Sequence, residues 1–99
     1  MSRKHAFLNA VFSEQFKSAY AALQSAQQEG VDKAVLALMK QRVTPGTRIK
    51  PIEPDKYYLE ARINAGDRLI HRVEAGVLHV VDVVTHDEIN RFGRRPKSR

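Results

Sequence analysis

The sequence predicts an α+β fold in which two helices pack on one face of a small, curved, mainly antiparallel sheet, in the order β-α-α-β-β-β. Apolar side chains recur at helical spacing over residues 13–42, whereas after residue 56 they alternate with polar ones, as they do in strands. Short turns at Ala65-Gly66 and Ala75-Gly76 then join the last three strands into an antiparallel meander.

The first strand and both helices are predicted before the Pro45-Gly46 turn. Phe7 to Phe12 is the predicted strand, and Ser13 stands where a helix N-cap belongs. The first helix is expected to close near Gly30, and its apolar side chains are Phe16, Ala19, Tyr20 and Leu23. The second helix is expected to be led by Asp32, and its apolar stripe is Val31, Ala34, Val35, Leu38 and Met39.

The second half of the chain reads as a connector followed by three strands. The connector, Thr47 to Lys56, contains two prolines and cannot be a central strand. The predicted strands are Tyr57 to Asn64, Arg68 to Glu74 and Val77 to Val84. We expect the sheet face away from the helices, and the sheet end near Thr85, to stay open to a ligand.

Composition excludes several classes of protein. Ninety-nine residues with 42% hydrophobic content allow one domain. The absence of cysteine excludes a disulfide framework and a thiolate zinc site. No apolar run approaches the roughly 18 residues of a membrane span, and the first apolar stretch is too short for a signal peptide. We therefore expect a cytoplasmic protein with no membrane partner and no cofactor.

The positive charge is concentrated at the end of the chain. The sequence has 17 basic and 11 acidic residues and a net charge of +6. Five of the basic residues and none of the acidic ones lie in Arg91 to Arg99. This balance predicts a polyanionic partner, with the tail providing most of the excess charge.

Four side chains near the predicted sheet form the most informative set: Arg62, Arg68, Arg72 and His86. Alternate residues of a strand share a face, so if Leu69 and Val73 pack on the helices, Arg68 and Arg72 project from the opposite face. Arginines fixed on a sheet lose less side-chain entropy on binding phosphate than arginines of a tail. Ordinary solvent-exposed strand positions are the alternative interpretation.

Two other histidine patterns point to structure rather than chemistry. His71 falls on the predicted apolar face and is expected to be a hydrogen-bonded core residue, not a catalyst. His86-Asp87-Glu88 has metal-binding residue types, but adjacent residues at a strand end point in different directions. No further ligand stands at a spacing that would complete the set, so no metal site is predicted.

The segment from Tyr57 to Arg72 resembles the central signature of the RelE/ParE toxin superfamily. It has a strand ending in Arg, a glycine-containing turn and then Arg-Leu-Ile. The apolar strand Val77 to Val84, the motif Thr85-His86-Asp87-Glu88 and the junction from Phe12 to Lys17 are similar too. The likeness spans residues 7–92 and implies a single RelE-like domain over residues 1–92, followed by a basic tail over residues 93–99.

The resemblance implies the toxin of a type II toxin–antitoxin pair. RelE-like members cleave mRNA in the ribosomal A site, whereas ParE-like members inhibit DNA gyrase and are not nucleases. The implied partners are an acidic antitoxin encoded by an adjacent gene, the ribosome and mRNA. A ParE-like gyrase inhibitor and a catalytically inactive RNA- or ribosome-binding module are the alternatives.

For the nuclease branch, the resemblance also implies roles for individual residues. A ribose 2′-OH would attack the adjacent phosphate, with Arg68 stabilising the phosphorane and Arg62 holding phosphate. His86 is the candidate for proton transfer, because imidazole exchanges protons near neutral pH. The residues expected to hold the RNA backbone are Arg48, Lys50, Lys56, Arg72, Arg91, Arg94 and Arg95.

Overall fold

A computed structural model of the chain describes residues 7–42, 45–53 and 56–89. Within these ranges the helices are α1 (Glu14–Ala21), α2 (Ser25–Lys40) and the 3-10 helix η1 (Pro45–Thr47). The strands are β1 (Asn9–Phe12), β2 (Lys50–Pro51), β3 (Leu59–Arg62), β4 (Asp67–Glu74) and β5 (Val77–Thr85). A helical turn over residues 86–89 follows β5.

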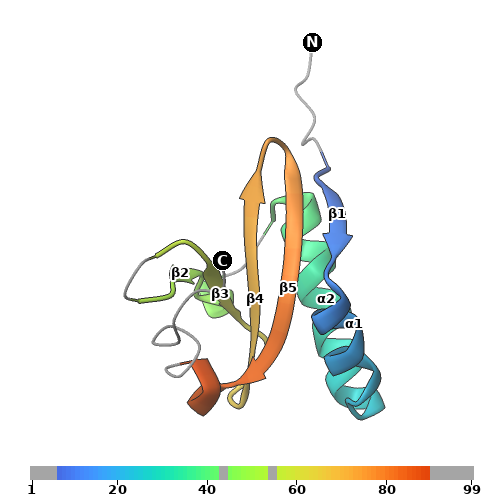
Figure 1. Cartoon of the computed structure of the whole chain (residues 1–99). Helices are drawn as coiled ribbons and strands as arrows, with labels where there is room; N and C mark the ends of the chain where they lie inside the picture. Colours follow the sequence, from blue (N-terminus) through green and yellow to red (C-terminus); the bar gives the residue numbers. More distant parts are fainter. Residues whose placement is uncertain (1–6, 43–44, 54–55, 90–99) are drawn as a thin grey trace.

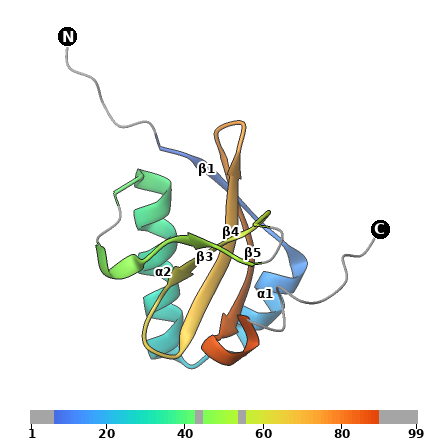
Figure 2. The ribbon, with the colours of Figure 1, turned by 90° about the vertical axis from the view of Figure 1, so that its left-hand side faces the viewer.

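The strands form one mixed sheet in the order β1-β5-β4-β3-β2. β1 runs parallel to β5, and the other neighbours are antiparallel. The two helices lie on one side of the sheet, whereas β2 and the turn after β5 lie toward the other side (Figures 1 and 2). The predicted α+β class and the antiparallel meander of the last three strands are therefore confirmed.

The boundary between the helices lies well before the predicted one. α1 ends at Ala21, and α2 begins at Ser25 after Gln24, whose backbone N–H donates to the Gln27 side chain in a reciprocal cap. Gly30, the expected end of the first helix, lies inside α2, where a Cβ atom would come within 3.0 Å of Ile63. The prediction was wrong because this glycine provides room for packing against the sheet, not a helix end. Among the described helices, none is long and apolar enough to cross a membrane.

The connector contributes a strand that the sequence-based prediction did not include. Lys50 and Pro51 pair with Glu60 and Leu59 as the edge strand β2. An edge strand tolerates proline because one side of its backbone needs no partner. The remaining strands match the predictions within a few residues. β1 begins later, at Asn9, and β3 covers only Leu59–Arg62, whereas β4 begins one residue earlier, at Asp67, and β5 ends one residue later, at Thr85.

The main core lies between the helices and the sheet. Its buried residues are Phe16, Val31, Val35, Leu38, Ala61, Leu69, Leu78, Val80 and Val83. Leu69 lies here as expected, but Val73 is 48% exposed. The prediction for Val73 was wrong because the β4–β5 hairpin extends beyond the end of the helices (Figure 1).

A second, smaller core covers part of the opposite sheet face. Ile70 is fully buried there beneath Ile52 of the connector and Ile89 of the last helical turn. Tyr58, Val81 and Val84 pack around this cluster. The expectation that this whole face stays open was therefore wrong, because apolar residues of two flanking segments fold over its centre. The sheet end near Thr85 remains exposed.

Candidate active site

Arg68 is the centre of a polar cluster at the exposed end of the sheet. Its Nη2 atom lies 3.0 Å from His86 Nδ1, and its Nε atom lies 3.6 Å from Glu60 Oε1. The Arg68 and Glu60 side chains are only 11% and 8% exposed, so the ion pair is largely shielded from water. A buried carboxylate needs such a partner, and here the partner is the arginine that contacts the histidine.

The turn between β3 and β4 fixes the Arg68 side chain through hydrogen bonds. Asn64 Oδ1 accepts hydrogen bonds from the N–H groups of Gly66 and Asp67, at 2.8 and 2.9 Å. This Asx turn directs its carbonyl groups at the guanidinium. Arg68 Nη1 donates to the carbonyl oxygens of Asn64, Ala65 and Asp67. All three guanidinium nitrogens therefore contact groups of the protein.

His86 is held by its backbone as well as by its ring. Its N–H donates to the carbonyl oxygen of Gly66 at 2.8 Å, which fastens the end of β5 to the β3–β4 turn. Thr85 and Glu88 form a capping box, since the Thr85 N–H donates to the Glu88 carboxylate and the Glu88 N–H donates to the Thr85 hydroxyl. His86 is exposed to solvent. Its contact with Arg68 involves only Nδ1 and does not use the second ring nitrogen, Nε2.

Two further cations lie on the same face in the neighbouring strands. Arg62 on β3 is directly opposite Arg68 on β4, and directly opposite residues share a face. Lys50 on β2 is likewise opposite Glu60. Among the described residues, none forms a hydrogen bond or ion pair with Arg62. The predicted grouping of Arg62, Arg68 and His86 is thus present, with Lys50 one strand further along.

Arg72 lies apart from this cluster although it shares the face of Arg68. Ile70, between the two arginines on β4, is covered by the second apolar core. The Arg72 guanidinium stacks over the Tyr57 ring, 4.9 Å from its centroid, and pairs with Glu74. The structure therefore does not bring Arg72 to His86.

The remaining predicted RNA-binding residues divide into two groups. Arg48 and Lys56 are exposed in the connector and both have positive φ angles. Arg91, Arg94 and Arg95 lie outside the described residues, as does the tail over residues 93–99.

His71 and the His86-Asp87-Glu88 motif were the two histidine patterns for which the sequence predicted no catalytic or metal-binding role. His71 is 1% exposed in the sheet, as expected for a core residue, and burial lowers its pKa below the ordinary value. The expected hydrogen bonding is not met at its Nδ1 atom, which has no partner within the described part of the chain. Glu88 of the His86-Asp87-Glu88 motif is part of the capping box. The described residues include no group of three or more metal-ligating side chains that could hold an ion.

Glu60 is the site residue that the sequence-based prediction missed. Strand alternation places Glu60 on the same face as Arg62, but the sequence-based prediction gave it no role. The available signal was this shared face, since a carboxylate two residues from Arg62 on a paired strand lies next to an arginine of the neighbouring strand.

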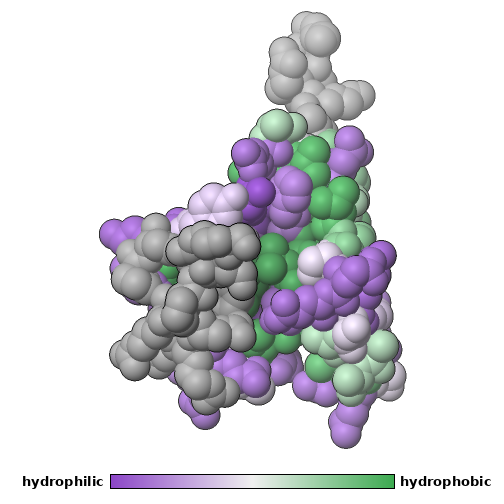
Figure 3. Space-filling view, viewed as in Figure 1, coloured by the Kyte–Doolittle hydropathy of each residue, from purple (hydrophilic) through white to green (hydrophobic). Residues whose placement is uncertain are grey.

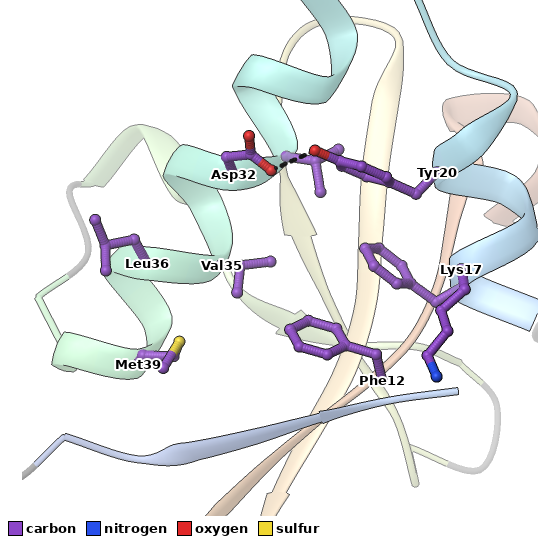
Figure 4. Close-up of a pocket in the computed structure, with 9 residues that line it drawn as sticks. Phe12, Lys17, Tyr20, Asp32, Val35, Leu36 and Met39 are labelled. Carbon is purple, nitrogen blue, oxygen red and sulfur yellow. Dashed lines mark hydrogen bonds between the residues drawn. The ribbon is translucent and has the colours of Figure 1, made fainter. Parts of the chain in front are cut away.

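A groove of about 540 Å³ lies on the helix side, away from this cluster. Figure 4 shows Phe12, Val35, Leu36 and Met39 around it, with the Tyr20 hydroxyl donating to Asp32 at 2.7 Å across the gap between the helices. This hydrogen bond raises the Tyr20 pKa. The groove is lined mainly by apolar side chains, and hydrophobic surface also extends over the neighbouring strands (Figure 3).

Comparison with solved structures places this arrangement in a known class of fold. The sequence matches no family model and no curated protein. Its two helices and mixed sheet, however, are those of RelE-like toxins from type II toxin–antitoxin systems, and the chain has that fold.

Three solved structures illustrate the similarity. YafQ from Escherichia coli strain BL21(DE3) superposes with a TM-score of 0.72 at 15% identity, over 83% of this chain and 97% of that one. A copper-bound mutant toxin from Helicobacter pylori gives 0.69 at 16% identity, over 82% and 97%. A chain of the RelBE2 toxin–antitoxin complex from Mycobacterium tuberculosis gives 0.66 at 15% identity, over 86% and 98%.

Proposed function

We propose that this chain is the toxin of a type II toxin–antitoxin pair and acts as a ribosome-dependent mRNA endonuclease. The observation that carries this proposal is the contact of Arg68 with His86 beside Arg62, at an exposed sheet end. The fold shared with solved toxins supports the same class. Cations and an imidazole at one exposed edge can supply the charge stabilisation and the proton transfer or hydrogen bonding on which phosphodiester cleavage depends.

The proposed reaction forms a bond between the ribose 2′ oxygen and phosphorus and breaks the bond from phosphorus to the 5′ oxygen. The 2′-OH loses a proton, the 5′ oxygen gains one, and negative charge develops on the phosphoryl oxygens. Arg62 would pair with that charge directly, and the positive charge of Arg68 beside His86 would stabilise it at longer range. His86 is placed to exchange a proton or a hydrogen bond with a reacting oxygen through Nε2.

The connector would guide RNA toward this edge. Lys50 lies on the strand next to Arg62, and Arg48 and Lys56 are exposed on either side of it in the sequence. Lysine and arginine bind the phosphate backbone without sequence preference. Arg72 and the basic residues of the tail would add to this attraction.

A cleavage assay tests the nuclease proposal directly. Purified protein is mixed with ribosomes on a defined mRNA, and cut sites are mapped for the wild type, Arg62→Ala, Arg68→Ala and His86→Ala. Lys33→Ala, an exposed cation on α2 far from the cluster, is the matched control. We expect cleavage by the wild type and the control, and loss of cleavage in the three site variants. Retained cleavage in both Arg68→Ala and His86→Ala would show that the site is wrong.

The same preparation separates the alternative functions. Inhibition of DNA supercoiling by gyrase without RNA cleavage would identify a ParE-like toxin. Salt-sensitive ribosome binding with neither activity would identify an inactive binding module.

The proposed partner is an acidic antitoxin encoded next to this chain. Two of the similar structures are toxin–antitoxin complexes, DinJ-YafQ and RelBE2. A partner that binds only the folded toxin raises its stability by mass action. We expect the product of the adjacent reading frame to raise the melting temperature and to stop growth arrest. An unchanged melting temperature would count against this partner.

A further inference from the structure

The contact between Arg68 and His86 can have only one donor. A guanidinium has five N–H groups and no acceptor, and it stays protonated at all physiological pH values. The 3.0 Å contact between Arg68 Nη2 and His86 Nδ1 is therefore a hydrogen bond from arginine to histidine. Nδ1 must accept it with its lone pair, so this nitrogen carries no proton. A neutral His86 ring in this arrangement has its proton on Nε2.

Arg68 is itself fixed, so it holds the ring rather than following it. Nε is beside the Glu60 carboxylate, and Nη1 donates to three carbonyl oxygens of the β3–β4 turn. These contacts leave Nη2 directed at His86. Glu60 is 6% exposed, and it sets the orientation of the guanidinium from within the sheet face.

We propose that Arg68, held by Glu60, is a positioning residue that fixes the tautomer of His86, so that the neutral ring carries its proton on Nε2. The ring then meets its ligand as a hydrogen-bond donor. A neutral imidazole can serve in this way, polarising an oxygen without giving up its proton. The proton that leaves the 2′-OH and the proton that reaches the 5′ oxygen are then exchanged with solvent water. The ligand oxygen is that of a phosphate, so this inference rests on the proposed function. Arg62, which has no partner among the described residues, is the cation left to pair with the phosphate charge.

Nitrogen NMR of the histidine rings in the free protein tests the proposal. Two-bond correlations show which ring nitrogen carries the proton, at a pH where the ring is neutral. The His86 signal is assigned by its loss in His86→Gln. We expect the wild type to give a single tautomer with the proton on Nε2. A proton on Nδ1, or an even mixture of tautomers, would overturn the proposal.

A double substitution shows whether the ion pair causes this preference. Arg68→Met combined with Glu60→Leu removes both charges and avoids an unpaired buried carboxylate, since apolar replacement of a buried pair is often tolerated. Arg72→Met with Glu74→Leu removes an ion pair on the same strand and is the matched control.

The expected result is a shift toward mixed tautomers in the site variant only. An unchanged tautomer in a folded site variant would overturn the proposal. Glu60→Gln, which keeps the shape of the side chain and removes its charge, is expected to give a smaller shift in the same direction. These measurements need no RNA. A wild type that fails to cleave mRNA would therefore refute the proposed function, while the tautomer of His86 could still be determined.

Discussion

The two sides of the sheet carry features of opposite character. At the exposed sheet end, Arg68 and His86 are held by hydrogen bonds and one ion pair, with no apolar filling between them. On the helix side, the groove between α1 and α2 is shaped by packed aromatic and aliphatic side chains such as Phe16. Directional bonds fix the orientation of individual atoms, whereas packing fixes volumes. Substitutions on the helix side should therefore change stability, and those at the sheet end should change function.

The largest effect is expected from Phe16→Ala in the groove. Phe16 is 6% exposed and packs between Phe12 and Tyr20, with ring centroids at 5.4 and 5.7 Å. Removing a buried phenyl ring should lower the free energy of unfolding by about 3–5 kcal/mol. Urea denaturation measures this, with Phe16→Leu as the milder variant. A loss below about 1 kcal/mol would show that the groove is not part of the structural core.

Arg62→Ala should give the opposite pattern. This side chain has no hydrogen bond or ion pair with the described residues, so its removal should change the free energy of unfolding by no more than about 0.5 kcal/mol. If it binds the developing phosphoryl charge, the cleavage rate should fall roughly 100-fold. Single-turnover cleavage on ribosomes, with urea denaturation of the same samples, measures both. A strongly destabilised variant would mean that Arg62 supports the fold.

Burial of His71 in the sheet should make the stability of the protein depend on pH. Burial lowers its folded-state pKa, and this outweighs the smaller opposing effect of the Leu69 backbone. The unfolded chain therefore binds a proton below its ordinary pKa of about 6.5, while the folded chain does not. Stability should fall as the pH drops below that value, down to the folded-state pKa. Urea midpoints at pH 7.5 and 5.5 should differ less in His71→Leu than in the wild type, and equal differences would contradict this.

The smallest expected effect is that of Lys50→Ala at the sheet edge. Lys50 is exposed, and without its charge the protein should neutralise one phosphate fewer on single-stranded RNA. The slope of log affinity against log salt should then become shallower by about 0.7. RNA binding at several salt concentrations measures the slope, with Lys33→Ala on the helix side as the control. An equal change in both variants would mean that RNA is attracted by overall charge alone.

Strand parity and turn chemistry were sufficient to predict part of this site. Arg68 is the second residue of β4 and His86 follows β5, so an antiparallel pair with Asp67 opposite Thr85 brings the two together. The sequence contained that information because residues on paired strands alternate between faces. The role of Glu60 could not be read in the same way, since its burial results from tertiary packing on a sheet face that the sequence predicted to be open.

The boundary between α1 and α2 was predicted wrongly for a different reason. Gly30 is of a residue type common at helix ends, but its position against Ile63 makes a small residue necessary in the helix interior. Local propensity therefore gave the wrong boundary, because a tertiary contact determined the residue type. The cap at Gln24 uses a glutamine pair, which is a weaker signal in sequence than serine or aspartate.

The parallel pairing of β1 with β5 has a consequence for the order of folding. Asn9 pairs with Val77 and Phe12 with Val80, so β1 can pair only after β5, more than 60 residues further along the chain, has been synthesised. Contacts so distant in sequence form late, because a long loop must close first. The apolar groove, with Phe12 on its wall, depends on that closure. The contact of His86 with Arg68 needs only the local β4–β5 hairpin. A chain synthesised only as far as β4 therefore has neither feature, because both need β5.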